Sequence, residues 1–211
     1  MKLLDLYSGA GGAAKGYQRA GFYVVGIDHK PMPRYCGDEF YQANALEYLA
    51  EYGHEYDVIH ASPPCQFGSK QTPMKYRPRH PNLIPQTRKL LKQTGKPYII
   101  ENVENVRRHL INPVLLCGSM FGLNIWRHRY FEISGLVMLV PPCNHEKLPV
   151  LITGTTRRII NGTEVRFEPS VAERAEAIEI DWMTGNELDE AIPPAYTEFI
   201  GRQLLAVLER A

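Results

Sequence analysis

The sequence predicts an α/β protein with a doubly wound, mainly parallel sheet and a small inserted hairpin region. The first observation is an apolar run at 2–7, a glycine-rich turn at 8–12 and a helical stretch at 13–20. A strand, a glycine turn and a helix in this order are typical of a sheet that brings a nucleotide-like ligand against backbone N–H groups. The second is an apolar run at 22–27 that ends in Asp28, whose carboxylate can accept hydrogen bonds from both hydroxyls of a ribose.

A cysteine stands directly after the next apolar run, which is the third observation. Residues 56–61 have the composition of a buried strand, and Ser62-Pro63-Pro64-Cys65-Gln66 follows. The two prolines restrict the backbone, so Cys65 is rigidly presented, and a thiolate is a strong nucleophile near neutral pH. Taken alone, this motif also fits a proline-stiffened loop with an inert thiol, and the glycine turn alone fits many ordinary turns.

Six motifs in order along the chain resemble those of the DNA (cytosine-5) methyltransferase family. They are Asp5-Leu6-Tyr7-Ser8-Gly9-Ala10-Gly11-Gly12, Gly26-Ile27-Asp28, Ser62-Pro63-Pro64-Cys65-Gln66, Glu101-Asn102-Val103, Arg127-His128-Arg129-Tyr130-Phe131 and Ala191-Ile192-Pro193-Pro194. The chain looks like a small, bacteriophage-type member with a minimal target-recognition region. The resemblance implies a Rossmann-like fold, S-adenosyl-L-methionine as cofactor, and double-stranded DNA with a flipped cytosine as substrate.

The resemblance assigns catalytic roles to four side chains. Cys65 would add to carbon 6 of cytosine, which makes carbon 5 nucleophilic enough to take a methyl group. Glu101 would protonate or hydrogen-bond ring nitrogen 3, a task that suits a buried carboxyl with a raised pKa. Arg127 and Arg129 are two apart on an expected strand, so both should point to one face, orient the ring carbonyl and favour the thiolate. The alternatives are a Glu101 that only caps a strand and arginines that only face water.

The resemblance also implies binding residues. The expected cofactor residues are Tyr7, Ser8, Gly9, Gly11, Gly12, Asp28, Asn44, Pro63 and Glu190. The expected substrate residues are Ser62, Pro64, Gln66, Ser69, Asn102 and Val103, with Asn102 also holding the loop of Glu101. Four positions depart from the family pattern. Ile125 replaces a Gln, Asp189-Glu190 replaces Gly-Asn with Glu190 at the Asn near the methionine part of the cofactor, and Asn44 stands where an Asp often contacts the adenine.

The segment after the cysteine is strongly basic, although the net charge of the chain is only +1. Residues 66–100 contain no acidic residue, and 67–85 has the composition of a long mobile loop, which is usually functional in a compact domain. We expect its basic side chains to contact DNA phosphates, namely Lys70, Lys75, Arg77 and Arg79. The alternative is an ordinary solvated loop, and Arg88, Lys89 and Lys92 are expected on the next helix, facing water.

The motif pattern stops between residues 134 and 188. We therefore expect 1–133 to form the cofactor-binding and catalytic core, 134–188 a short insert or minimal target-recognition region, and 189–211 a segment returning to the core. Within the insert, Asn161-Gly162 between the apolar-rich runs 150–160 and 163–167 predicts a hairpin. Its arginines are candidates for DNA contact, namely Arg157, Arg158 and Arg166.

A helix with a capping box should follow the hairpin. Ser170 is its expected N-cap, and Glu173 stands three residues later, as a capping box requires.

Composition agrees with one compact enzyme, since 211 residues with 44% hydrophobic content can bury a full core. No signal peptide or run of about 20 apolar residues is visible, so we expect no membrane association. Four cysteines without a pairing pattern indicate a cytoplasmic setting, in a bacterial or phage-infected cell if the resemblance holds. We expect a monomer.

The other cysteines, Cys36, Cys117 and Cys143, lack such a context, and we expect them to be structural or incidental. Cys143-Asn144-His145 has the residues of half a metal site, but no second CxxC or HxxxH pair is visible, so no metal is expected.

Two other functions stay open. One keeps the chemistry but acts on a free pyrimidine nucleotide, or transfers an altered group from a modified cofactor. The other is a non-catalytic DNA-binding relative, for which the loss of Cys65 or Glu101 would be typical.

Overall fold

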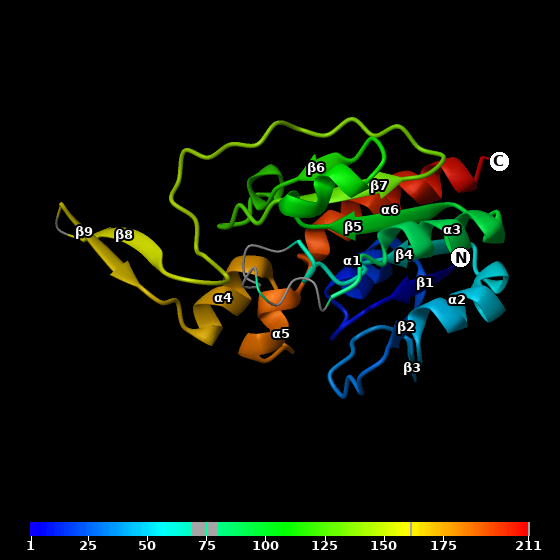
Figure 1. Cartoon of the computed structure of the whole chain (residues 1–211). Coiled ribbons are helices and arrows are strands. Elements are labelled where there is room, and N and C mark those ends of the chain that lie inside the picture. Colours follow the sequence, from blue (N-terminus) through cyan, green and yellow to red (C-terminus); the bar gives the residue numbers. More distant parts are fainter. Residues whose placement is uncertain (69–74, 76–79, 161, 211) are drawn as a thin grey trace.

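The computed structural model describes residues 1–68, 75, 80–160 and 162–210. Seven strands from these residues form one sheet in the order β3–β2–β1–β4–β5–β7–β6 (Figure 1). The strands are β1 Lys2–Leu6, β2 Tyr23–Asp28, β3 Glu39–Gln42, β4 Val58–Ala61, β5 Tyr98–Asn102, β6 Val114–Leu116 and β7 Arg129–Ile133. The first five pair in parallel, whereas β7 is antiparallel to both β5 and β6. The doubly wound, mainly parallel sheet is therefore confirmed.

Helices cover both faces of the sheet (Figure 1). On one face, α1 (Gly12–Ala20) and α6 (Pro194–Leu208) pack against the sheet. Their side chains Tyr17, Tyr196 and Ile200 are buried in the core that the helices share with it. The other face carries α2 (Ala45–Tyr52) and α3 (Ile84–Thr94). Three 3-10 helices complete this part, namely η1 (Gly53–Glu55), η3 (Glu104–His109) and η4 (Gly118–Phe121). Both faces are apolar because a parallel sheet is buried on both sides.

Close packing of α1 on α6 depends on small residues. A Cβ atom at Gly16 would collide with the carbonyl of Pro194 and the hydroxyl of Thr197. Gly21 follows the last residue of α1, and its φ of 111° provides a left-handed cap. The absence of a side chain at Gly16 therefore lets α6 pack closely on α1.

A buried ion pair joins α3 to β7, and it corrects one expectation. Arg88 was expected to face water, but its guanidinium binds both carboxylate oxygens of Glu132 and the carbonyl of His109. The Arg88 and Glu132 side chains are 13% and 4% exposed. Sequence alone could not reveal this, since the partner stands on an antiparallel strand 44 residues away.

The inserted region follows a long connecting segment, residues 134–155, which lies outside helices and strands. The hairpin is confirmed as β8 (Thr156–Ile160) and β9 (Thr163–Phe167), although β8 begins at Thr156 rather than at residue 150. It projects from the body of the molecule (Figure 1). Asn161 of the expected turn lies outside the described residues.

Two helices tie the insert to the body. α4 (Val171–Ile178) begins with the predicted capping box of Ser170 and Glu173, and α5 (Gly185–Glu190) follows. Ile178 and Leu188 bury against Ala10 of the glycine turn and Ile125 in a small separate core. The expected boundary at 188/189 therefore falls inside α5, and the division into three parts stays a prediction.

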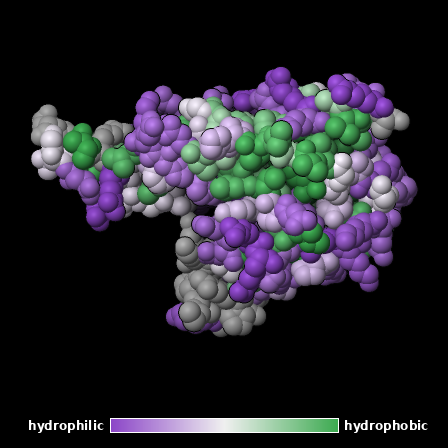
Figure 2. Space-filling view, turned by 90° about the horizontal axis from the view of Figure 1, so that it is seen from above, coloured by the Kyte–Doolittle hydropathy of each residue, from purple (hydrophilic) through white to green (hydrophobic). Residues whose placement is uncertain are grey.

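Hydrophobic residues also gather on the outside of the molecule. Figure 2 shows a green band over the upper face of the body, beside a mostly hydrophilic remainder. Val137 and Leu139 of the connecting segment are 92% and 89% exposed. Among the helices that the structure describes, none has the length and apolar character needed to cross a membrane.

Candidate active site

The expected site residues gather where the parallel strands end. Ser8 N–H donates to the carbonyl of Ile27, and Ser62 N–H donates to that of Leu6, so the segments after β1, β2 and β4 leave the sheet together. The strand order reverses between β1 and β4. In open α/β sheets a ligand binds in the crevice at this point.

The glycine turn leaves room for a ligand at one of its three glycines. Gly9 has a φ of 51°, and no atom of the described residues lies within 4 Å of the position that a Cβ would take. Gly11 and Gly12 are instead packed, because a Cβ there would lie 2.9 Å from Cys36 Sγ and 2.5 Å from the Ile192 carbonyl oxygen. The open approach is therefore at Gly9, next to Ser8.

Asp28 lies beside this opening. Its carboxylate accepts hydrogen bonds from Gly9 N–H at 3.1 Å and Lys30 N–H at 3.0 Å, and His29 Nδ1 lies 3.1 Å away. A carboxylate has about four lone-pair positions, so it retains capacity for a further donor such as a ribose hydroxyl.

The other expected cofactor residues have partners within the protein. The Tyr7 hydroxyl contacts Thr87 at 3.3 Å, and burial raises the pKa of Tyr7. Asn44 caps α2 by accepting from Leu46 N–H, so its side chain has a structural task. Pro63 is buried, whereas Glu190 is exposed at the end of α5.

Cys65 is held by contacts of the residues that follow it. Gly68 N–H donates to the Cys65 carbonyl, and Phe67 packs edge-on against His109, with ring centroids 5.4 Å apart. A Cβ at Gly68 would collide with Val106 of η3. The beginning of the expected mobile loop is thus packed on the core.

The surroundings of Cys65 raise the pKa of its thiol and so favour the protonated form. Burial raises its pKa, Glu101 and Glu190 raise it further, and Arg129 acts in the opposite direction. Arg129 therefore favours the thiolate as expected, but burial has the larger effect.

Glu101 and Arg129 form a buried ion pair across β5 and β7. Glu101 Oε1 lies 3.0 Å from Arg129 Nε, and the side chains are 7% and 14% exposed. Burial raises the pKa of Glu101, while Arg129, a hydrogen bond from Ser62 and Arg127 lower it. Because burial dominates, Glu101 holds a proton to a higher pH than an ordinary carboxyl does.

A buried chain of hydrogen bonds ends at Glu101, and the sequence did not reveal it. The Tyr17 hydroxyl lies 2.9 Å from His60 Nδ1, His60 Nε2 lies 2.9 Å from Ser62 Oγ, and Ser62 donates to Glu101. Burial lowers the pKa of His60 to about 3, so its ring is neutral. Tyr17 donating to Nδ1 gives the tautomer in which Nε2–H donates to Ser62, which leaves the Ser62 proton for Glu101. The only available signal was His60 in an apolar strand, where a buried structural histidine is common.

Another buried carboxyl lies on the same side of the sheet. Asp5 is 1% exposed, its Oδ2 has no hydrogen-bond partner within the described part of the chain, and it stands opposite His60 in the register of β1 and β4. Burial raises the pKa of Asp5 well above its ordinary value, and Asp28 and Glu101 add to this.

Arg127 departs from expectation. β7 begins at Arg129, and Arg127 has a φ of 33°, so the two arginines do not share one strand face. The Arg127 guanidinium donates to the carbonyls of Leu188, Asp189 and Ala191. It thereby holds the C-terminal end of α5, because a cation stabilises the unpaired carbonyls there. Burial and Arg129 lower the pKa of Arg127 to about 9.

The expected substrate residues divide into two groups. The Asn102 amide donates to the Pro63 carbonyl at 2.8 Å and accepts from Val103 N–H, so it fixes the cysteine turn rather than facing a ligand. Ser62 belongs to the buried chain described above. Partly exposed positions are left for Pro64, Gln66 and Val103, and Oε1 of Gln66 has no hydrogen-bond partner among the described residues.

The expected DNA contacts are described only in part. Ser69, Lys70, Arg77 and Arg79 lie outside the described residues, and Lys75 is exposed. On the hairpin, the Arg157 and Arg166 side chains are 57% and 65% exposed, lie opposite each other across the two strands, and both approach Glu164 Oε1. Ile125 is 1% exposed in the small core of the insert.

Solved structures share this fold across the whole chain. A protein described as a DNA modification methyltransferase encoded within an E. coli prophage aligns with a TM-score of 0.60 at 15% identity, covering 99% of both chains. The S. pombe Dnmt2 methyltransferase aligns with a TM-score of 0.64 at 12% identity, covering 99% of both chains. The Entamoeba histolytica methyltransferase EhMeth aligns with a TM-score of 0.64 at 11% identity, covering 99% of this chain and 98% of the other. At these identities the likeness establishes the fold.

Sequence-level comparison adds no relative. No protein-family model matches the chain, and no curated protein matches its sequence.

Proposed function

We propose that this protein transfers a methyl group from S-adenosyl-L-methionine to carbon 5 of cytosine in DNA, with Cys65 as the nucleophile. The observation that carries the proposal is the convergence of Cys65 and the buried Glu101–Arg129 pair beside the open turn at Gly9. A thiol, a protonated carboxyl and a fixed cation are the groups that this reaction needs. The three similar solved structures are all described as methyltransferases, which supports the same class.

The chain offers a fitting place for the cofactor. The space at Gly9 lets a ligand approach the backbone, and the remaining capacity of Asp28 suits a ribose. S-adenosyl-L-methionine, when bound there, supplies the electrophilic methyl group.

The protein groups carry out the remaining steps. Cys65 gives its thiol proton to water, and its sulfur forms a bond to carbon 6, which pushes an electron pair towards carbon 5 and nitrogen 3 of the ring. Glu101 gives its proton to nitrogen 3, and Ser62 then stabilises the carboxylate that remains. After methyl transfer to carbon 5, a water molecule removes the carbon-5 proton, the sulfur leaves carbon 6, and nitrogen 3 returns its proton to Glu101.

DNA is the proposed substrate because basic side chains extend away from this edge. The exposed arginines Arg157 and Arg166 lie on a hairpin that projects from the body (Figure 1). The cytosine must leave the base stack, since carbon 6 cannot be attacked within the duplex.

Nucleoside mass spectrometry tests the proposal. DNA incubated with the protein and S-adenosyl-L-methionine should gain one methyl group on deoxycytidine, and the Cys65→Ala variant should produce none. Methylation of a free pyrimidine nucleotide but not of DNA would mean that the nucleotide, and not DNA, is the substrate. Absence of transfer to either, from folded protein, would contradict the proposal.

A further inference from the structure

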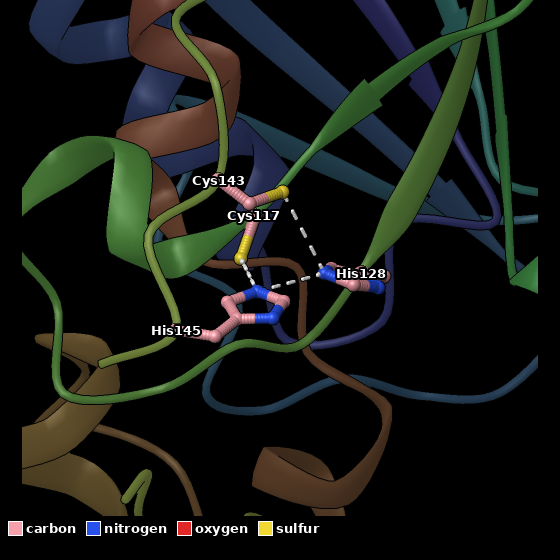
Figure 3. Close-up of side chains that lie close together, drawn as sticks. All are labelled: Cys117, His128, Cys143 and His145. Atoms are coloured by element: carbon pink, nitrogen blue, oxygen red, sulfur yellow. Dashed lines mark hydrogen bonds between the residues drawn. The ribbon is translucent and has the colours of Figure 1, made fainter. Parts of the chain in front are cut away.

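A cluster of two cysteines and two histidines lies apart from the groups assigned above. Cys117, His128, Cys143 and His145 each turn one ligand atom towards a common centre (Figure 3), and these atoms all lie within 4.8 Å of one another. Cys143 and His145 are the half site seen in the sequence. The other half comes from Cys117, after β6, and His128, before β7, whose spacing follows no metal motif.

We propose that these four side chains bind one Zn²⁺ ion. In a tetrahedral zinc site two nitrogens lie roughly 3.3 Å apart, and a sulfur and a nitrogen roughly 3.6 Å apart, given the usual bond lengths. Here Nε2 of His128 lies 3.3 Å from Nε2 of His145. Cys117 Sγ lies 3.3 Å from His145 Nε2, and Cys143 Sγ lies 3.8 Å from His128 Nε2. These three separations are thus close to those of a zinc tetrahedron, and the other pairs of ligand atoms lie within 4.8 Å.

The chemistry of the set favours zinc. Two thiolates and two neutral imidazoles are a common structural zinc set, and the thiolates neutralise the charge of the ion. This neutrality suits the location, because Cys117 is 0% exposed and His128 and Cys143 are partly buried, while His145 lies at the exposed side of the cluster.

Neighbouring groups hold the ligands in place. The Trp126 ring stacks on His145 with centroids 4.2 Å apart and planes inclined by 19°. Ser119 Oγ lies 3.2 Å from Cys117 Sγ and accepts a hydrogen bond from Asn144 N–H. Such outer contacts orient metal ligands.

The backbone brings the two halves together. Gly118 N–H donates to the Trp126 carbonyl, which sets the chain after β6 beside the chain before β7. The Tyr196 hydroxyl of α6 donates to the carbonyls of Trp126 and Arg127.

The ion would have a structural role. Four protein ligands fill a tetrahedral zinc, so no position is left for a reacting water. The bond network would fasten the long connecting segment to the sheet, next to Arg129 and its partner Glu101. This inference is independent of the proposed function.

Metal analysis tests the proposal on the untagged full-length chain. Protein purified without chelator should contain about one zinc per chain by inductively coupled plasma mass spectrometry. Replacing zinc with Co²⁺ should produce the thiolate-to-cobalt charge-transfer and strong d–d bands of a tetrahedral site. Folded protein that binds neither ion would overturn the proposal.

Variants locate the ion. Cys143→Ser and His145→Gln should each lower the zinc content at least about tenfold after dialysis against a weak chelator, since each removes a ligand. The matched controls Cys36→Ser and His54→Gln, outside the cluster, should retain the zinc of the unmodified protein. Equal retention in all four variants would contradict the assigned ligands.

Thiol titration distinguishes the ion from a disulfide. In the zinc-bound protein, Cys117 and Cys143 should resist a thiol reagent until a strong chelator is added. If a reductant restores the reactivity of the two thiols, a chelator does not, and no zinc is found, then the two cysteines form a disulfide and the proposal fails.

Discussion

The carboxyl edge of the sheet and the region 134–169 hold their side chains in different ways. At the edge, Cys65 lies in the turn after β4, and Glu101 lies near the end of β5. Hydrogen bonds such as that from the Asn102 amide to the Pro63 carbonyl fix the turns there. The second region has an exposed hairpin and a long connecting segment outside helices and strands. Its described contacts with the body include the Cys117–His145 cluster and the small core around Ile178. The side chains proposed to react thus lie at the ends of the sheet strands. The surface proposed to contact a large partner lies on the projecting hairpin.

The largest effect should come from the sulfur at the rigid edge. Cys65→Ala should lower the rate of methyl transfer by roughly 10³-fold or more, because the covalent route is lost. The melting temperature, measured in parallel, should change little, because Cys65 is only partly buried. A variant that keeps most of its activity would mean that the edge carries no nucleophile.

A pH profile tests the carboxyl beside it. Glu101→Gln should lower the rate by roughly 10²-fold or more. The pKa of Glu101 and that of Cys65 are both raised, and the proposed reaction needs the protonated acid together with the thiolate. The rate of the unmodified protein should therefore pass through a maximum, since Cys65 gains thiolate and Glu101 loses its proton as the pH rises.

In Glu101→Gln the amide cannot lose a proton, so the rate should climb with pH to a plateau. A falling alkaline limb in this variant would show that another group supplies the proton.

The projecting region should affect binding rather than chemistry. The double variant Arg157→Ala/Arg166→Ala should weaken duplex binding about tenfold and reduce the salt dependence by about two counterions. The free energy of unfolding should be unchanged, because both side chains are exposed. Glu164→Gln is the matched control and should bind more tightly, since it releases both arginines from an acidic neighbour. Unchanged affinity in both proteins would exclude the hairpin from the DNA contact.

The smallest effect should come from Asp5, beneath the rigid edge. Because its pKa is raised in the folded state, the stability linked to its proton is complete below the ordinary pKa and is lost as the pH rises through the raised value. Asp5→Asn should therefore raise the free energy of unfolding by about 1 kcal/mol above that range. Urea titrations at several pH values measure this, with exposed Asp181→Asn as control. A loss of stability at high pH would mean that the Asp5 charge is compensated.

The sequence by itself determined the parallel core and the positions of the main candidate side chains. Alternating apolar runs and caps such as Gly21 are local signals, and strand ends in a parallel sheet necessarily meet at one edge. Cys65, Asp28 and Glu101 could be located for this reason. The capping box at Ser170 and the hairpin were also predicted from local signals, and both are confirmed.

Only the tertiary structure decided which side chains contact one another. The Arg88–Glu132 pair, the chain from Tyr17 through His60 to Glu101, and the binding of Arg127 to α5 all join residues distant in sequence. The same holds for Cys117 and His128, which complete a half site that looked isolated. Burial, which sets the pKa of each of these groups, depends on the packing of the whole chain and leaves no local pattern in the sequence.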